Sequence, residues 1–189
     1  MHGLRRAGTM RSLAAFLART DPEIFALCEI DAGNALALAT RFVRQYAYRG
    51  GQALFLKSSG SITAVSDEPV LLWPSRPFDR RGVVCVKARR GNGMVSVLTA
   101  KIASRRKQRA AEVRHLRNIV RALETPAILF VHLTHEAALH FPGYERVAFA
   151  RALSERIYQS GFMVRNASVE DSPHHGMATP VAATLSREA

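Results

Sequence analysis

Glu29 is the residue of this sequence whose type and position best suit chemistry. It is the one acidic residue of the apolar run 24–30, which has the length of a strand, and it stands near that run's C-terminal end. Asp31 or Asn34 then opens a helical pattern. Open sheets tend to place binding and catalytic groups at such strand ends, so Glu29 could act as a metal ligand or a general base. It could also pair with an arginine or face solvent, without a catalytic role.

Three histidines in the segment 132–140 suggest a second possible metal site. The histidines of a zincin helix lie four residues apart on one face, whereas His135 and His140 are five apart, about 140° around a helix. This spacing argues against a zincin site. It leaves open a loop-built site that combines His132 and His135 with Glu29.

Basic residues dominate the charge of the chain. Lys and Arg number 27 against 15 Asp and Glu, for a net charge of +12, and the resulting field favours polyanions such as nucleic acid, phosphoesters or an anionic membrane surface. An arginine-rich composition can also reflect a GC-rich genome.

On a helix predicted over residues 104–123, an apolar stripe stands opposite a basic face formed by Lys107, Arg114, Arg117 and Arg121. That face is either a phosphate-binding patch or an ordinary solvated surface, since no aromatic residues are interleaved to stack on bases.

Length, cysteines and hydropathy place the chain among globular proteins. With 189 residues, 48% of them hydrophobic, one domain over 1–189 can bury a substantial core. Cys28 and Cys85 lie in apolar runs without C-x-x-C spacing, which predicts buried thiols in a reducing compartment. No run approaches the roughly 18 apolar residues of a membrane span, and no signal-type core follows the first residues, so we expect a cytoplasmic protein.

Strand and helix patterns alternate along the chain, with one clear hairpin among them. The hairpin joins 82–88 to 94–100, and its turn contains an Asn-Gly that can supply positive φ angles. This mixture favours mixed sheets with helices packed outside. Helices are predicted around 10–17, 36–46, 104–123 and 147–157, and the remaining strands at 24–30, 52–57, 62–65, 70–73, 127–131, 162–169 and 180–185.

Several segments, in this order, match motifs of one known family. Residues 21–31 match P-D-v-v-x-L-Q-E-v-d with Cys28 in place of glutamine, and 51–58 match G-x-A-i-L-S-r. Residues 96–104 and the following 109–116 match v-x-n-T-H-L-x-S and R-x-x-q-v-x-x-L. Over most of its length the chain thus resembles the endonuclease/exonuclease/phosphatase superfamily, whose members include deoxyribonucleases, exonuclease III-like enzymes and inositol or sphingolipid phosphoesterases.

The resemblance implies an α+β fold and a metal-dependent phosphoester chemistry. The fold would be a four-layered α/β/β/α sandwich of two mixed sheets flanked by helices, with the family's first strand missing. Glu29 would bind Mg²⁺ or Mn²⁺, which neutralises phosphoryl charge while water attacks in line. His175 would be the family's phosphate-contacting histidine, with His174 where its aspartate partner belongs. The pair could equally be a solvated loop before the last strand.

The chain also departs from the family at positions that carry chemistry. The family's G-D-F-N segment, which positions water and substrate, is replaced by residues 131–134, where His132 stands. The histidine of its T-H-L segment is also lost, since residues 99–102 offer only a lysine, Lys101. Loss of such groups typically costs several orders of magnitude in rate. His132 is therefore predicted as a catalytic replacement and Lys101 as a phosphate-binding one.

Three functional hypotheses follow. The first is a divergent metal-dependent phosphoesterase that uses Glu29 and His175 together with His132 or Lys101. The second is a catalytically impaired member that binds phosphate ligands or nucleic acid through Lys101, Arg114, Arg117 and Arg121. The third is a basic interaction module with only a superficial likeness to the family.

Overall fold

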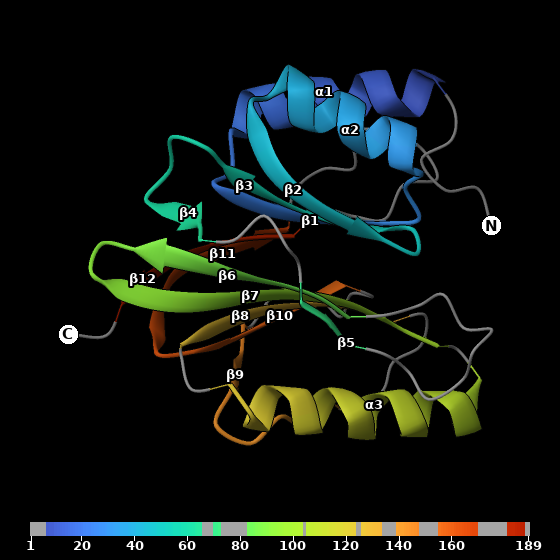
Figure 1. Cartoon of the computed structure of the whole chain (residues 1–189), viewed down its shortest axis with the longest axis vertical. Coiled ribbons are helices and arrows are strands. Elements are labelled where there is room, and N and C mark those ends of the chain that lie inside the picture. Colours follow the sequence, from blue (N-terminus) through green and yellow to red (C-terminus); the bar gives the residue numbers. More distant parts are fainter. Residues whose placement is uncertain are drawn as a thin grey trace.

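The structure is a computed structural model, and it describes residues 7–65, 70–72, 83–103, 105–123, 126–133, 139–147, 155–169 and 181–187. In Figure 1 the described elements form four layers: two helices, a small sheet, a large sheet and a third helix. The elements are α1 (Ala7–Thr20), β1 (Ile24–Cys28), α2 (Ala32–Arg41), β2 (Arg44–Arg49), β3 (Gln52–Lys57), β4 (Ile62–Ala64), β5 (Val70–Leu72), β6 (Val83–Arg90), β7 (Gly93–Ile102), α3 (Arg106–Arg121), β8 (Ala127–Leu133), β9 (Glu145–Arg146), β10 (Glu155–Ser160), β11 (Phe162–Val169) and β12 (Val181–Arg187).

The small sheet carries α1 and α2 on its outer face. Its strands run antiparallel in the order β1-β3-β2. Asp31 caps α2 by accepting a hydrogen bond from the Asn34 N–H at 2.9 Å, which satisfies a donor that the first helical turn leaves unpaired. Phe25 and Phe55 stack at 4.4 Å beneath the two helices, within an outer core that includes Leu38.

The large sheet has seven strands and contains the one parallel pair among the described strands. Its order is β4-β6-β7-β8-β10-β9, with β5 also paired to β6. Strands β7 and β8 run parallel, and α3 forms the crossover between them. The Glu112 carboxylate of α3 accepts a hydrogen bond from the Ala103 N–H at 2.6 Å, which ties the helix to the end of β7. A separate two-stranded sheet pairs β11 with β12.

Alternation along the strands decides which side chains lie between the sheets. On β7, Val95 and Val97 join the inner core together with Leu54 and Leu56 of β3. Leu98 on β7 instead packs with the buried face of α3. The sandwich of two sheets flanked by helices, predicted from the sequence, is confirmed. The large sheet is mixed, and the small one is antiparallel throughout.

The helix predicted over 36–46 is wrong in its second half. Helix α2 ends at Arg41, and Tyr46 lies in the strand β2. Val43, between them, has a φ of 50°, which a β-branched residue in a helix cannot have. The apolar positions from Phe42 to Tyr48 fit a helical period as well as an alternating one, so the pattern alone could not separate them.

The helix predicted around Val147 and Ile157 is also wrong for these two residues. Ile157 lies in strand β10, and its carbonyl accepts a hydrogen bond from the Val147 N–H at 2.9 Å. On one helix, residues ten positions apart would be about 15 Å from each other. The other two residues of that pattern, Ala150 and Leu153, fall outside the described residues.

The predicted hairpin of β6 and β7 is confirmed, but its turn uses a different dipeptide. Arg90 pairs with Gly93, so the two-residue loop is Gly91-Asn92. Gly91 has the positive φ, 57°, that such a loop needs at its first position. The expected Asn-Gly step, Asn92-Gly93, has no positive φ.

Neither cysteine forms a disulfide. Cys85 is buried in β6, and burial raises the pKa of its thiol to about 11, as for a structural rather than a reactive cysteine. None of the described helices is long and apolar enough to cross a lipid bilayer.

Candidate active site

The parallel pair β7 and β8 places Lys101 beside His132. The two residues are register partners near the C-terminal ends of their strands. Lys101 follows Val95 and Val97 at even spacing, and His132 follows Ile128 and so shares the sheet face that turns toward the small sheet. Lys101 and His132, which stand in segments where the chain departs from the family's motifs, are thus neighbours at one end of the sandwich.

Glu29 reaches the same end from the small sheet. It directly follows β1 and has a φ of 64°, a left-handed conformation that is uncommon outside glycine. The chain is held there because the Ile30 N–H donates to the Gly51 carbonyl at 3.2 Å, and Gly51 itself has a φ of 83°. Strained backbone of this kind costs about 1–3 kcal/mol and often marks functional positions.

An ion pair between Glu29 and Lys101 joins the two sheets across 72 positions of sequence. Lys101 Nζ donates a hydrogen bond to Glu29 Oε1, and the side chains keep 17% and 37% of their surface exposed. This hydrogen bond and the charge of Lys101 hold the pKa of the Glu29 carboxyl below its usual value, against the opposing effect of partial burial. The charge of a protonated His132 acts in the same direction. Glu29 is therefore a carboxylate at neutral pH.

The described residues around Glu29 do not fit the Mg²⁺ or Mn²⁺ site that the resemblance implies. Magnesium is usually held by one or two carboxylates together with water and substrate oxygens. Within the part of the chain that the structure describes, no three His, Cys, Asp or Glu side chains are grouped to share a metal ion. The Glu29 carboxylate is instead neutralised by the ammonium of Lys101.

The predicted basic patch on α3 lies apart from this cluster. Val113 and Leu116 of α3 pack on the large sheet from the face opposite to that of Lys101 and His132. Arg114 and Arg121 are exposed on the outer side of the helix, and Arg117 is half-buried. The structure thus separates Lys101 from the arginines with which it was grouped as a phosphate or nucleic-acid contact.

The structure does not place the other candidate histidines beside Glu29, Lys101 and His132. His175 and His135 fall outside the described residues. His140 is exposed, and its backbone carbonyl accepts a hydrogen bond from Arg117 Nε at 3.0 Å. The structure therefore brings together Glu29, Lys101 and His132 and leaves the loop-built histidine site untested.

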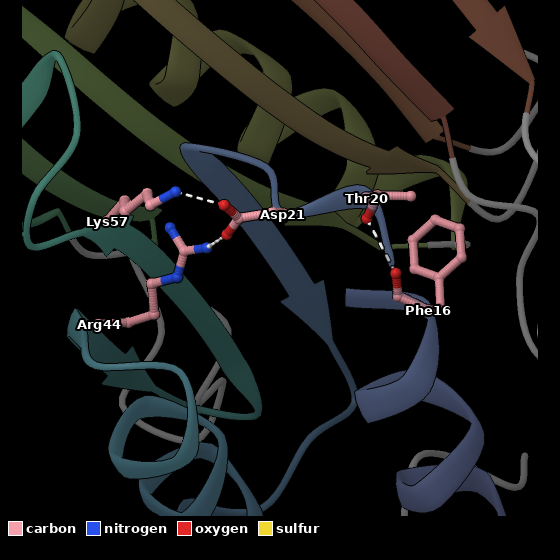
Figure 2. A network of polar contacts seen from close by, with 5 residues as sticks. All are labelled: Phe16, Thr20, Asp21, Arg44 and Lys57. Carbon is pink, nitrogen blue, oxygen red and sulfur yellow. Dashed lines mark hydrogen bonds and ion pairs between the residues drawn. The ribbon is translucent and has the colours of Figure 1, made fainter. Parts of the chain in front are cut away.

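The opposite end of β1 carries a second ion cluster, which the sequence pattern did not indicate. Figure 2 shows Lys57 and Arg44 converging on the Asp21 carboxylate, with an Arg44 Nη2 to Asp21 Oδ1 distance of 2.7 Å. The nearby Thr20 hydroxyl donates to the Phe16 carbonyl at the end of α1. The hydrogen bond from Lys57 is the main cause that lowers the pKa of Asp21. This cluster fastens the turn between α1 and β1 to the strands β2 and β3.

Gln52 is a further polar residue near Glu29 that sequence reasoning did not single out. It opens β3, is register partner to Cys28, and is buried between the sheets with 1% of its surface exposed. Its position before the apolar run 53–56 of that strand was the one available signal.

Comparisons with known proteins address the fold. No protein-family model matches this sequence, and no curated protein matches it either. Solved structures do match it. An endonuclease/exonuclease/phosphatase protein of Bacteroides vulgatus superposes with a TM-score of 0.76 at 12% identity, over 95% of this chain and 91% of that one.

Two other matches carry named ligands or activities. A mannosyl-6-phosphatase of Bacteroides thetaiotaomicron gives a TM-score of 0.69 at 16% identity, over 93% of this chain and 90% of that one. D. rerio TDP2, complexed with a single-strand DNA product, gives 0.70 at 14% identity, over 86% and 83%. Each of these three matches covers 83% or more of both chains, so this chain has the fold of the endonuclease/exonuclease/phosphatase superfamily.

Proposed function

We propose that this protein is a phosphoesterase-like protein that binds and hydrolyses a phosphate ester where Glu29, Lys101 and His132 meet. The observation that carries the proposal is their convergence from three separate strand ends of the two sheets. Since these strands span most of the sequence, we also propose that 1–189 acts as a single domain. The phosphatase and the DNA-bound TDP2 among the structural matches support the class of substrate.

Each residue of the cluster has a distinct role in this proposal. Lys101 has three N–H donors, so while one is held by Glu29 the others can bind phosphoryl oxygens. In hydrolysis, the water oxygen bonds to phosphorus and gives up a proton, the ester P–O bond breaks, and the leaving oxygen takes a proton. His132 is the residue to carry that proton, because imidazole takes up and releases protons near neutral pH. Glu29 holds the Lys101 ammonium in place.

We include His175 in the proposed site because of the sequence resemblance. It would contact the phosphate as the family's histidine does. Replacing His175 by asparagine is expected to lower turnover, and replacing the exposed His140 in the same way serves as the control.

Turnover of p-nitrophenyl phosphate and bis(p-nitrophenyl) phosphate tests the proposal. We expect release of p-nitrophenol by the wild type. On phenyl phosphate, whose poorer leaving oxygen needs the proton that His132 carries, we expect a loss of about 10²–10⁴-fold in kcat for His132→Asn. Glu29→Gln is expected to reduce kcat/KM because it releases the Lys101 ammonium. The assays are run with Mg²⁺, with Mn²⁺ and with EDTA.

The chain offers matched controls at the opposite end of the same sheet. Glu23 there accepts hydrogen bonds from Ser61, and Lys57 is paired with Asp21. Glu23→Gln and Lys57→Met should therefore leave turnover unchanged. Equal losses in Glu23→Gln and Glu29→Gln, or no turnover of either ester under any of the three conditions, would contradict the proposal.

A second candidate function is nucleic-acid binding through α3. The helix carries six Lys or Arg residues and a single acidic one, Glu112. Lys107, Arg114, Arg117 and Arg121 lie in one row along its outer side, at a spacing that could follow a phosphate backbone. Because this row faces away from Lys101, the two functions would use different surfaces.

A further inference from the structure

The Glu29–Lys101 pair puts a cation of the chain at the carboxylate that the sequence resemblance assigns to a metal. Lys101 is a register partner of His132 in the parallel pair, and its aliphatic stem is largely covered between the sheets. Its ammonium reaches Glu29 and, among the described residues, makes no other ion pair. The charge at this carboxylate is thus balanced without any added ion.

The charge of the cluster suits an anion better than a metal. Glu29 contributes one negative charge and Lys101 one positive charge, and His132 adds a second positive charge whenever it is protonated. A divalent cation would meet a carboxylate already neutralised and a repelling ammonium beside it. A phosphate would meet the ammonium, whose remaining N–H donors form short charge-assisted hydrogen bonds to phosphoryl oxygens.

We infer that the Lys101 ammonium takes the place of a divalent cation in this protein, so that the site binds phosphate groups without a metal. This inference rests on the proposed function, and it deepens it by stating how the substrate is held. Its converse is that Glu29 becomes able to bind a divalent cation once the Lys101 side chain is removed.

Two binding measurements on the purified protein test the inference without relying on turnover. Calorimetric titration with inorganic phosphate should give the same affinity in EDTA as in Mg²⁺ for the wild type, and an affinity lower by about tenfold or more for Lys101→Ala. Paramagnetic resonance of unbound Mn²⁺ should show tighter Mn²⁺ binding by Lys101→Ala than by the wild type, by about tenfold or more.

The controls separate the site from the surface charge and from folding. Lys57→Ala breaks one of the two ion pairs of Asp21 and changes the net charge equally, so it should match the wild type in both titrations. The double variant Glu29→Gln with Lys101→Ala should lose the gained Mn²⁺ binding. Circular dichroism shows that each variant is folded.

The possible failures are distinguishable. Phosphate binding by the wild type that requires Mg²⁺, or wild-type Mn²⁺ binding that Glu29→Gln abolishes, would overturn the inference and leave the proposed function standing. A wild type that binds no phosphate under either condition would refute both. Phosphate binding in EDTA that Lys101→Ala does not weaken would place the phosphate elsewhere and overturn the inference alone.

Discussion

Glu29 has a strained backbone and forms an ion pair. These two features affect the position and the pKa of its carboxylate. Its φ of 64° is maintained by the hydrogen bond between Ile30 and Gly51 and points the residue out of the strand. An effective general base has a pKa near the working pH, whereas the pKa of Glu29 is lowered by Lys101. We therefore assign Glu29 to holding the ammonium rather than to removing a proton.

The titration of Glu29 provides a prediction at this scale. By carboxyl ¹³C NMR, Glu29 should titrate below 4.5, its ordinary value, and Lys101→Met should move the midpoint upward. Since the folded-state pKa is the lower one, the pair stabilises the fold above about pH 4.5, and this contribution is lost as the pH falls through the folded-state value. An unchanged midpoint in Lys101→Met would contradict the pairing.

At the residue scale, the sequence predicted the candidates but not their contact. A lone carboxylate at a strand exit identified Glu29, and altered family motifs identified Lys101 and His132. The pairing of Glu29 with Lys101 joins residues 72 positions apart and depends on how two sheets are stacked. Periodicity in the sequence describes the faces of single elements, so it carries no information on that stacking.

At the element scale, the unit β7–α3–β8 positions the cluster. The crossover through α3 makes the two strands parallel, which brings Lys101 and His132 into register at the same end. The three elements of this unit were predicted from the sequence because the apolar stripe of α3 and the apolar run of β8 are unambiguous, whereas their parallel pairing was not. Strands β2 and β10 were missed because their apolar residues also fit a helical spacing, and only pairing with neighbouring strands settles their conformation.

The turn between β10 and β11 offers a stability prediction. Gly161 has a φ of 72°, and a Cβ there would lie 3.0 Å from Pro126 Cβ. Gly161→Ala should lower the free energy of unfolding by more than the roughly 1–2 kcal/mol of the left-handed conformation alone, because the proline ring must also move. Urea denaturation measures this decrease.

Gly91→Ala is the matched control for this turn. Gly91 has a φ of 57°, but a Cβ there would meet nothing within 4 Å. The decrease in its free energy of unfolding should be limited to the conformational cost of about 1–2 kcal/mol. Equal decreases at the two positions would mean that Gly161 does not pack against Pro126 as described.

At the scale of the whole molecule, the ion cluster and the basic row of α3 lie in different layers. The cluster of Glu29, Lys101 and His132 lies between the sheets at one end, whereas the basic row of α3 forms part of the opposite outer layer (Figure 1). The four-layer order behind this separation was predicted from the sequence through the family resemblance. The composition alone, with its net charge of +12, could not show how the charge is distributed.

Nucleic-acid binding by α3 leads to a prediction about salt dependence. Replacing Arg114, Arg117 and Arg121 by glutamine should reduce the slope of log K against log salt for single-stranded DNA by about 0.7 for each phosphate that the helix no longer neutralises. Fluorescence anisotropy at several salt concentrations measures the slope. The control replaces Arg11, Arg19 and Arg41 by glutamine. These three arginines are exposed on α1 and α2, so the same charge is removed from the outer layer on the other side of the molecule. If both triple variants reduce the slope equally, the binding is a property of net charge and not of α3.

A phosphate site at Glu29, Lys101 and His132 is tested most directly by an amide NMR titration of the wild type with phenylphosphonate, which is not hydrolysed. We expect saturable shifts concentrated at the ends of β1, β7 and β8, present in EDTA and absent in Lys101→Ala. Shifts confined to α3, or spread over the basic surface without saturation, would contradict it.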